Sequence, residues 1–213
     1  MLVSVSTMPA GNNYLKYVKE IENFTDFMHL DVCDGVYNQT KCFSVEFAKE
    51  INRNSTIPLD CHLMTKNAIN FAEDYIKAGA NIVTAQIESF ETKNEVLKYI
   101  NFVHDRNALC GLSLEIETKL DEILQYLKYL DIILIMSVKT GKSGQKFDES
   151  VILKIKKLAE LRQKNKLDFK IEVDGGITEK EAIILKNFGV DIVVSGNFVF
   201  SSQNKKDAIN LLK

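Results

Sequence analysis

The stretch FMHLDVCDG at residues 27–35 and the related stretch PLDCHLM at residues 58–64 are short apolar runs interrupted by ionisable side chains. Successive side chains of an extended strand point to opposite faces, so residues two apart share a face. His29 and Asp31 therefore point the same way, and His62 lies near the end of its own strand. A buried strand carries such groups only where something satisfies them.

A third apolar run, IEVDGGI at residues 171–177, ends in Asp174 just before two glycines. The three runs together supply two histidines and two carboxylates at strand ends: His29, Asp31, His62 and Asp174. One HxD pair alone is more often a hydrogen-bonded core pair than a ligand set. Four such groups would be costly to satisfy without an ion, so the pattern predicts a metal site.

The donor set mixes nitrogen and oxygen, which suits Zn, Fe or Mn and does not choose among them. We therefore expect one divalent metal ion as the cofactor. Asp60 shares a strand face with His62 and is a candidate to support that histidine.

The composition is that of an ordinary soluble globular protein. The 213 residues are 46% hydrophobic and 26% charged, and the formal net charge of −2 gives no sign of a nucleic-acid partner. No apolar run approaches the roughly 20 residues that span a bilayer, and the first residues lack the pattern of a signal peptide. We expect a cytoplasmic protein that binds neither membrane nor nucleic acid.

The four cysteines have no spacing typical of a disulfide framework or of a four-thiol zinc site. They are Cys33, Cys42, Cys61 and Cys110. In a cytoplasmic chain this predicts reduced and mostly buried thiols.

Strand-like and helix-like segments alternate along the whole chain, with no linker or change in composition between them. The expected strands span residues 2–8, 26–32, 58–64, 81–87, 109–115, 131–138, 168–174 and 191–195. The expected helices span residues 14–23, 45–52, 68–78, 95–106, 120–127, 149–164, 179–187 and 205–212.

Eight strand–helix pairs predict a parallel sheet of the α/β class, closed as a single-domain (β/α)8 TIM barrel over residues 1–213. An open doubly wound sheet is the alternative, but a GxGxxG turn after the first strand is absent. Chemistry in such a barrel lies at the C-terminal ends of the strands, where the four candidate ligands are expected.

Small residues after three late strands offer backbone N–H groups to an anion. The candidate phosphate contacts are Gly141, Ser143, Gly144, Gly175, Gly176, Gly196 and Asn197. Each group alone reads as an ordinary turn, but phosphate commonly binds after strands seven and eight of such barrels.

The motifs HLDVCDG, LDCHLM, LIMSV with GQKF, and VDGGI occur in this order over nearly the whole chain. The ordered set resembles the ribulose-phosphate 3-epimerase family, which includes hexulose-phosphate relatives. The resemblance implies a ribulose-phosphate-binding barrel that holds one metal ion through His29, Asp31, His62 and Asp174. It also implies that Asp31 and Asp174 exchange the proton at C3 of a ketose phosphate.

The same resemblance implies substrate contacts for Ser6, His62, Met64, Met136 and Asp174. Cys33 stands where the family has a third methionine. Three loops depart from the family pattern. TGKSGQ at residues 140–145 replaces PGFGGQ, so that Lys142 stands for an aromatic residue and Ser143 for a glycine. VYN at residues 36–38 replaces the longer HFVPN, and Gln86-Ile87 stands in place of the family's histidine before Glu88.

The resemblance implies an isomerase that converts D-ribulose 5-phosphate to D-xylulose 5-phosphate through a metal-stabilised enediolate. The altered loops keep allulose 6-phosphate and a tetrulose 4-phosphate open as substrates. Two other classes are weaker: related decarboxylases carry a DxKxxD motif that the third strand lacks, and a non-catalytic sugar-phosphate binder would not need both aspartates. The sequence leaves the oligomeric state open, a homo-oligomer included.

Overall fold

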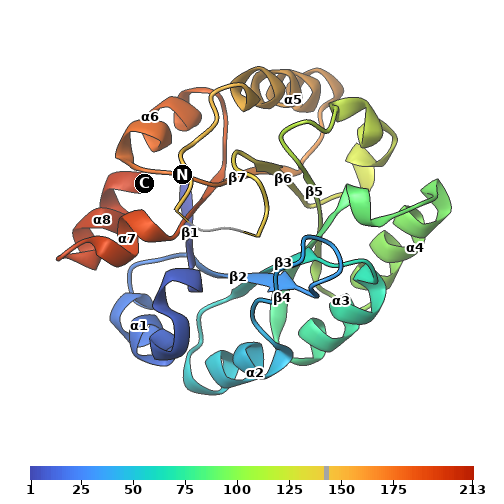
Figure 1. Ribbon diagram of the computed structural model, residues 1–213. Coiled ribbons are helices and arrows are strands. Elements are labelled where there is room, and N and C mark those ends of the chain that lie inside the picture. The colour runs from blue at the N-terminus through green and yellow to red at the C-terminus, as the bar shows by residue number, and fades with distance from the viewer. Residues whose placement is uncertain (142–143) are drawn as a thin grey trace.

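The computed structural model of the chain describes residues 1–141 and 144–213. Among these residues, eight parallel strands pair in sequence order, and the first pairs with the last. The sheet is therefore closed, and helices surround it on the outside (Figure 1). This confirms the predicted (β/α)8 barrel and excludes the open sheet, which would leave two edge strands unpaired.

The strands of the barrel are short. They are β1 Leu2–Ser6, β2 Phe27–Cys33, β3 Leu59–Met64, β4 Ala80–Gln86, β5 Leu109–Leu114, β6 Ile132–Met136, β7 Lys170–Asp174 and β8 Ile192–Ser195. The α-helices are α1 Tyr14–Ile21, α2 Val45–Asn54, α3 Ala68–Lys77, α4 Lys93–His104, α5 Val151–Asn165, α6 Glu179–Asn187, α7 Asn197–Ser201 and α8 Lys205–Leu212.

One expected α-helix, at residues 120–127, is wrong. The chain there forms two 3₁₀ segments, η3 Leu120–Glu122 and η4 Leu124–Tyr129. The buried side chains of Leu120, Ile123 and Tyr126 recur at every third residue, which matches the three residues per turn of a 3₁₀-helix. Three further short segments were not expected: η1 Met8–Asn13, η2 Ile87–Ser89 and α7.

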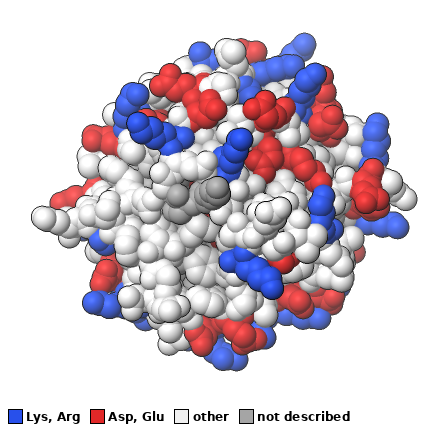
Figure 2. Space-filling view, in the orientation of Figure 1, with Lys and Arg blue, Asp and Glu red and all other residues white. Residues whose placement is uncertain are grey.

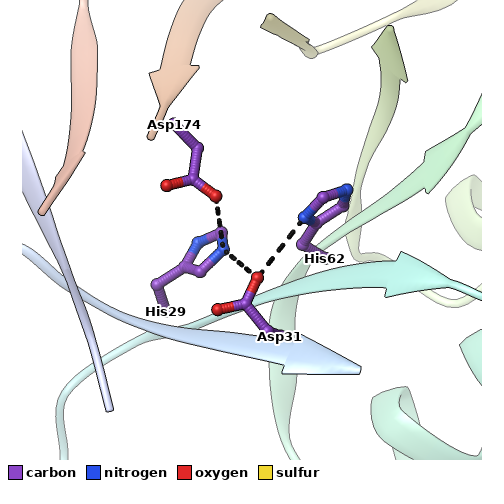
Figure 3. Close-up of side chains that lie close together, drawn as sticks. All are labelled: His29, Asp31, His62 and Asp174. Atoms are coloured by element: carbon purple, nitrogen blue, oxygen red, sulfur yellow. Dashed lines mark ion pairs between the residues drawn. The ribbon is translucent and has the colours of Figure 1, made fainter. Parts of the chain in front are cut away.

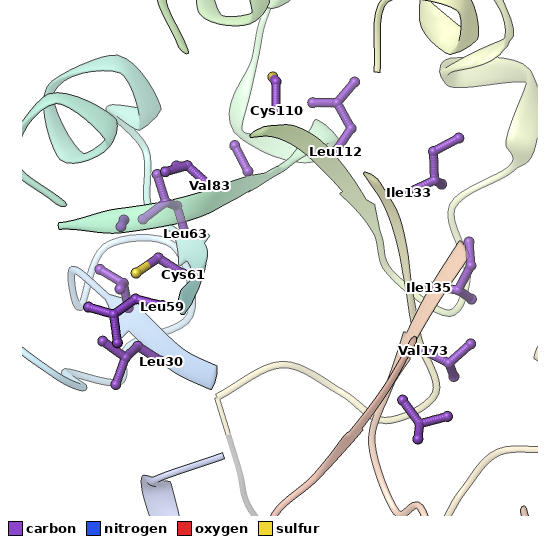
Figure 4. Close-up of a cluster of buried hydrophobic side chains, with 14 of the residues drawn as sticks. Leu30, Leu59, Cys61, Leu63, Val83, Cys110, Leu112, Ile133, Ile135 and Val173 are labelled. Atoms are coloured by element: carbon purple, nitrogen blue, oxygen red, sulfur yellow. The ribbon is translucent and has the colours of Figure 1, made fainter. Parts of the chain in front are cut away.

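The outward faces of the strands pack against the helices. Their side chains are almost all aliphatic and buried, as on β6, where Ile133 and Ile135 are fully enclosed (Figure 4). Burial of a Val, Leu or Ile side chain stabilises a fold by about 1.5–3 kcal/mol, so this layer is the main stabilising core.

The inward faces of the strands are different. At the N-terminal end of the barrel, Ile82, Ile132 and Ile192 form an apolar plug against Phe27. Above the plug the interior becomes polar, with buried Ser, Thr, His, Asp and Glu side chains. Gly111 faces this space, because a Cβ there would lie 2.2 Å from Thr84 Oγ1.

The strand register aligns the candidate ligands. Asp31 of β2 pairs with His62 of β3, and Met136 of β6 pairs with Asp174 of β7. Period-two alternation within each strand and register between strands thus bring distant parts of the chain to one end of the barrel.

The expectation that all four cysteines are reduced is wrong for two of them. Cys33, at the end of β2, forms a disulfide with Cys42, and their Cα atoms lie 4.7 Å apart. The bridge closes the loop between β2 and α2. Cys61 and Cys110 are free and buried, as expected.

The outer surface carries both signs of charge. Lysine and arginine side chains are mixed with aspartate and glutamate along much of the rim on the face shown in Figure 2. In the part of the chain that the structure describes, no helix is long and apolar enough to cross a membrane.

Candidate metal and active site

The four predicted ligands meet at the C-terminal end of the barrel. Asp31 Oδ1 lies 3.5 Å from His29 Nε2 and 3.6 Å from His62 Nδ1, and Asp174 Oδ2 lies 3.9 Å from His29 Nε2 (Figure 3). One ligand atom from each residue falls within 4.8 Å of all the others. Strands β2, β3 and β7 therefore aim four donors at one small volume.

These residues fit a metal ion. His29 Nε2 and His62 Nδ1 are both buried and have no hydrogen-bond partner among the described residues, although each faces the cluster. A metal ion bound about 2.0–2.2 Å from each ligand atom would separate its ligands by roughly 3–4 Å, as found here. A bound cation would supply the partner that both ring nitrogens lack.

The two carboxylates of the cluster differ in their electrostatics. Burial raises the pKa of Asp174 to about 6, and the neighbouring charge of Asp31 adds to the effect. Burial also opposes ionisation of Asp31, but the adjacent His29 and His62 outweigh it and hold the pKa of Asp31 well below its usual range. The site thus pairs one firmly ionised carboxylate with one that readily carries a proton.

A second buried layer lies directly beneath the cluster. Asp60 Oδ2 is 2.7 Å from His29 Nδ1 and accepts a hydrogen bond of 2.8 Å from the Ser4 hydroxyl. The expectation that Asp60 supports His62 is therefore corrected, because its carboxylate contacts His29. Glu172 joins His29 and Asp60 in this layer. Burial raises the pKa of Glu172 well above its usual value, and the negative charge of Asp60 raises it further.

Sequence reasoning missed two residues of this region. Glu172 lies two residues before Asp174 and so shares its strand face, a signal that IEVDGG contained. Gln86, the last residue of β4, lies with its Nε2 3.0 Å from His62 Nε2. The departure at Gln86-Ile87 marked the position, but only the register between β3 and β4 brings the side chain of Gln86 to His62.

A cavity of about 530 Å³ opens above the cluster. Many of the predicted site residues line it: Ser6, Asp31, Met64, Met136, Gly141, Gly144, Asp174, Gly175, Gly176, Gly196 and Asn197. His29 and His62 lie beneath its floor and are fully buried. Ser143 and Lys142 lie outside the described residues.

Part of the cavity wall is apolar. Met64 and Met136 are 1% and 2% exposed, so they exclude water rather than contact it. The Ser6 hydroxyl donates a hydrogen bond of 3.3 Å to Asp31 Oδ2 and accepts one of 3.2 Å from the Met8 backbone N–H. Ser6 therefore orients Asp31 besides facing the cavity.

A larger hollow of about 740 Å³ lies elsewhere, beside α5, β7 and the turn after α6. It contains none of the predicted site residues, and Arg162 within it is already bound to Asp191 and to the carbonyls of Phe169 and Gly189. The chemistry therefore belongs to the smaller cavity.

Comparison with known proteins agrees with the geometry. The model of the ribulose-phosphate 3 epimerase family matches residues 3–200. Ribulose-phosphate 3-epimerase from Helicobacter pylori is 34% identical over 215 residues, covering 100% of this chain and 97% of that protein. The enzyme of the same name from Aquifex aeolicus is 31% identical over 193 residues, covering 91% and 86%.

Among solved structures, 3-hexulose-6-phosphate synthase from Salmonella typhimurium superposes with a TM-score of 0.73. The match covers 100% of this chain and 96% of that one at 14% sequence identity. At that identity the likeness concerns the fold alone, and it supports the barrel.

The buried contact between His29 and Asp60 predicts a large loss of stability on Asp60→Ala. The substitution leaves His29 and Ser4 without their common partner, and breaking a buried charged pair costs about 3–5 kcal/mol. Urea unfolding in the presence of a chelator measures the free energy of unfolding. Asp105→Ala, at an exposed position after α4, is the control and should change it by under about 0.5 kcal/mol. A loss below about 1 kcal/mol for Asp60→Ala would contradict this assignment.

Proposed function

Because the chain belongs to the ribulose-phosphate 3-epimerase family, we propose that it inverts C3 of a ketose phosphate, converting D-ribulose 5-phosphate to D-xylulose 5-phosphate. Membership of the family makes the chain an isomerase. One observation carries the proposal. Two carboxylates, Asp31 from β2 and Asp174 from β7, approach His29 Nε2 to 3.5 and 3.9 Å at the floor of the cavity.

Inversion at C3 needs a proton removed on one face of the sugar and returned on the other. A carboxylate on each side of a planar intermediate can do both, because the group that has taken up a proton is the acid of the reverse reaction. Asp31 and Asp174 stand on strands that are far apart around the barrel, and both line the cavity. We assign them as the acid–base pair.

The C3 proton is a weak acid because the negative charge left behind must rest on oxygen. A divalent ion held by His29, Asp31, His62 and Asp174 would supply the positive charge that stabilises those oxygens. Zn, Fe and Mn all suit this mixed donor set.

The enclosure of the site raises the basicity of Asp174 by keeping water away. Met64 and Met136 enclose the reacting end with polarizable, apolar groups that offer no competing proton. Desolvation disfavours the ionised form of a carboxylate, which makes it a better base than it would be in water.

The far end of the cavity suits a phosphate group. Gly144, Gly175 and Gly176 have φ values of 80°, 122° and 65°, which let backbone N–H groups approach an anion where a side chain would intervene. Lysine side chains also line this region: Lys139, Lys146 and Lys180. We propose that this end binds the substrate phosphate, as the positions after β7 and β8 commonly do.

The acid–base assignment predicts that Asp31→Asn and Asp174→Asn each abolish exchange of the C3 proton with solvent deuterium. An amide cannot take up the proton, so the rate should fall by a factor of about 10² or more. NMR of D-ribulose 5-phosphate in deuterated water measures the rate, with allulose 6-phosphate and a tetrulose 4-phosphate as comparison substrates. Asp105→Asn, on the surface, should exchange at the wild-type rate.

Exchange at the wild-type rate in either active-site variant would refute the assignment. If the wild-type protein turned over one of the comparison sugars faster, the assigned reaction type would stand, but the assigned substrate would be wrong.

The phosphate assignment predicts a charge effect at Gly196, which lines the cavity and whose added Cβ would lie 3.2 Å from Pro9 Cγ. Gly196→Asp places a negative charge near the phosphate and should raise KM at least about tenfold above that of Gly196→Asn, its uncharged isostere. Initial rates at varied substrate concentration give both values. Equal KM values for the two variants would place the phosphate elsewhere.

A further inference from the structure

The two ring nitrogens of His62 have different neighbours. Nδ1 faces Asp31 Oδ1 at 3.6 Å and, although it is buried, has no hydrogen-bond partner within residues 1–141 and 144–213. Nε2 lies 3.0 Å from the carboxamide nitrogen of Gln86. Gln86 is fully buried, and its carboxamide oxygen also lacks a partner in this part of the chain.

A neutral imidazole carries one proton on its two nitrogens. If Nδ1 of His62 gives its lone pair to a metal ion, the proton must be on Nε2, and that N–H needs an acceptor. The NH₂ end of a carboxamide cannot accept it, but the oxygen end can. The two ends have nearly the same shape, so a half-turn of the terminal torsion exchanges them without repacking.

We propose that Gln86 is a positioning residue for the metal site, whose carboxamide oxygen accepts the Nε2–H of His62 and so presents the lone pair of Nδ1 to the ion. The inference rests on the metal site proposed above. With the NH₂ end toward the ring, His62 instead holds its proton on Nδ1 and cannot act as a ligand.

His29 is held in the opposite sense. Its Nδ1 lies 2.7 Å from Asp60 Oδ2, and an ionised carboxylate only accepts, so the proton stays on Nδ1 and Nε2 is free for the ion. The tautomer of His29 is thus set by the Asp60 carboxylate, and the tautomer of His62 is set by the Gln86 carboxamide, which can turn. Two hydroxyls on the same inner face, those of Thr84 and Ser113, have no partner in the described part of the chain and could receive the turned NH₂ group of Gln86.

Nitrogen NMR of the zinc-loaded protein tests the tautomers directly. The chain has three histidines, so ¹⁵N-histidine labelling gives a simple spectrum, and His104→Gln identifies the surface residue. We expect His62 to be protonated on Nε2 and His29 on Nδ1. A zinc-loaded protein whose His62 carries its proton on Nδ1 would overturn the proposal.

Zinc affinity of the purified protein, measured by competition with a chromophoric chelator, gives a second test that does not depend on activity. Gln86→Met removes the acceptor at similar size and should weaken zinc binding about 10–100-fold. Gln86→Glu restores an acceptor and should bind zinc within about threefold of the wild-type affinity. Ser89→Ala, a buried polar-to-apolar change in the segment that follows β4, should leave the affinity unchanged.

The outcomes separate this proposal from the function on which it rests. Wild-type affinity in Gln86→Met would overturn the role of Gln86 and leave the metal site intact. If wild-type protein binds no zinc, iron or manganese, the metal site falls and this inference falls with it. If Gln86→Met does not fold, the nitrogen NMR spectrum of the zinc-loaded wild-type protein still shows which nitrogen of His62 carries the proton.

Discussion

Uncompensated charge inside a closed barrel is the constraint on which this structure depends. Six ionisable side chains share the upper interior: His29, Asp31, Asp60, His62, Glu172 and Asp174. Four carboxyl groups against two imidazoles leave an excess of negative charge even when both rings are protonated. Protons can neutralise part of it, since burial raises the pKa of both Glu172 and Asp174. When both rings are neutral, as metal ligands must be, a divalent cation would offset two of the negative charges, which gives a physical reason for a metal at this point.

The barrel meets this constraint by dividing its interior into levels. The apolar plug around Ile132 closes the bottom, Asp60 and Glu172 form a buried acidic layer above it, and the ligand atoms face the cavity. Each level is set by the alternation of side chains along short parallel strands. The outer aliphatic layer stabilises the fold, which the polar interior does not. The chain can therefore stay folded although the buried charges of the site lower its stability.

The sequence predicted the barrel and the meeting of its four candidate ligands because both depend on local periodicity. The bounds of α6 and α8 were also predicted, since apolar spacing and flanking residues define them. The contacts of Asp60 and Gln86 could not be read, because they depend on which strand lies beside which and in what register. The bond between Cys33 and Cys42 was missed because it depends on how one loop folds back. The 3₁₀ segments near Ile123 were read as helix because spacings of three and four are hard to separate.

X-ray absorption at the zinc edge of the loaded protein tests the central claim most directly. The account predicts a shell of nitrogen and oxygen at about 2.0–2.2 Å with outer scattering from two imidazoles. A sulfur shell at about 2.3 Å, or a shell without imidazole scattering, would contradict it, because the ion would then sit outside the cluster formed by His29, Asp31, His62 and Asp174.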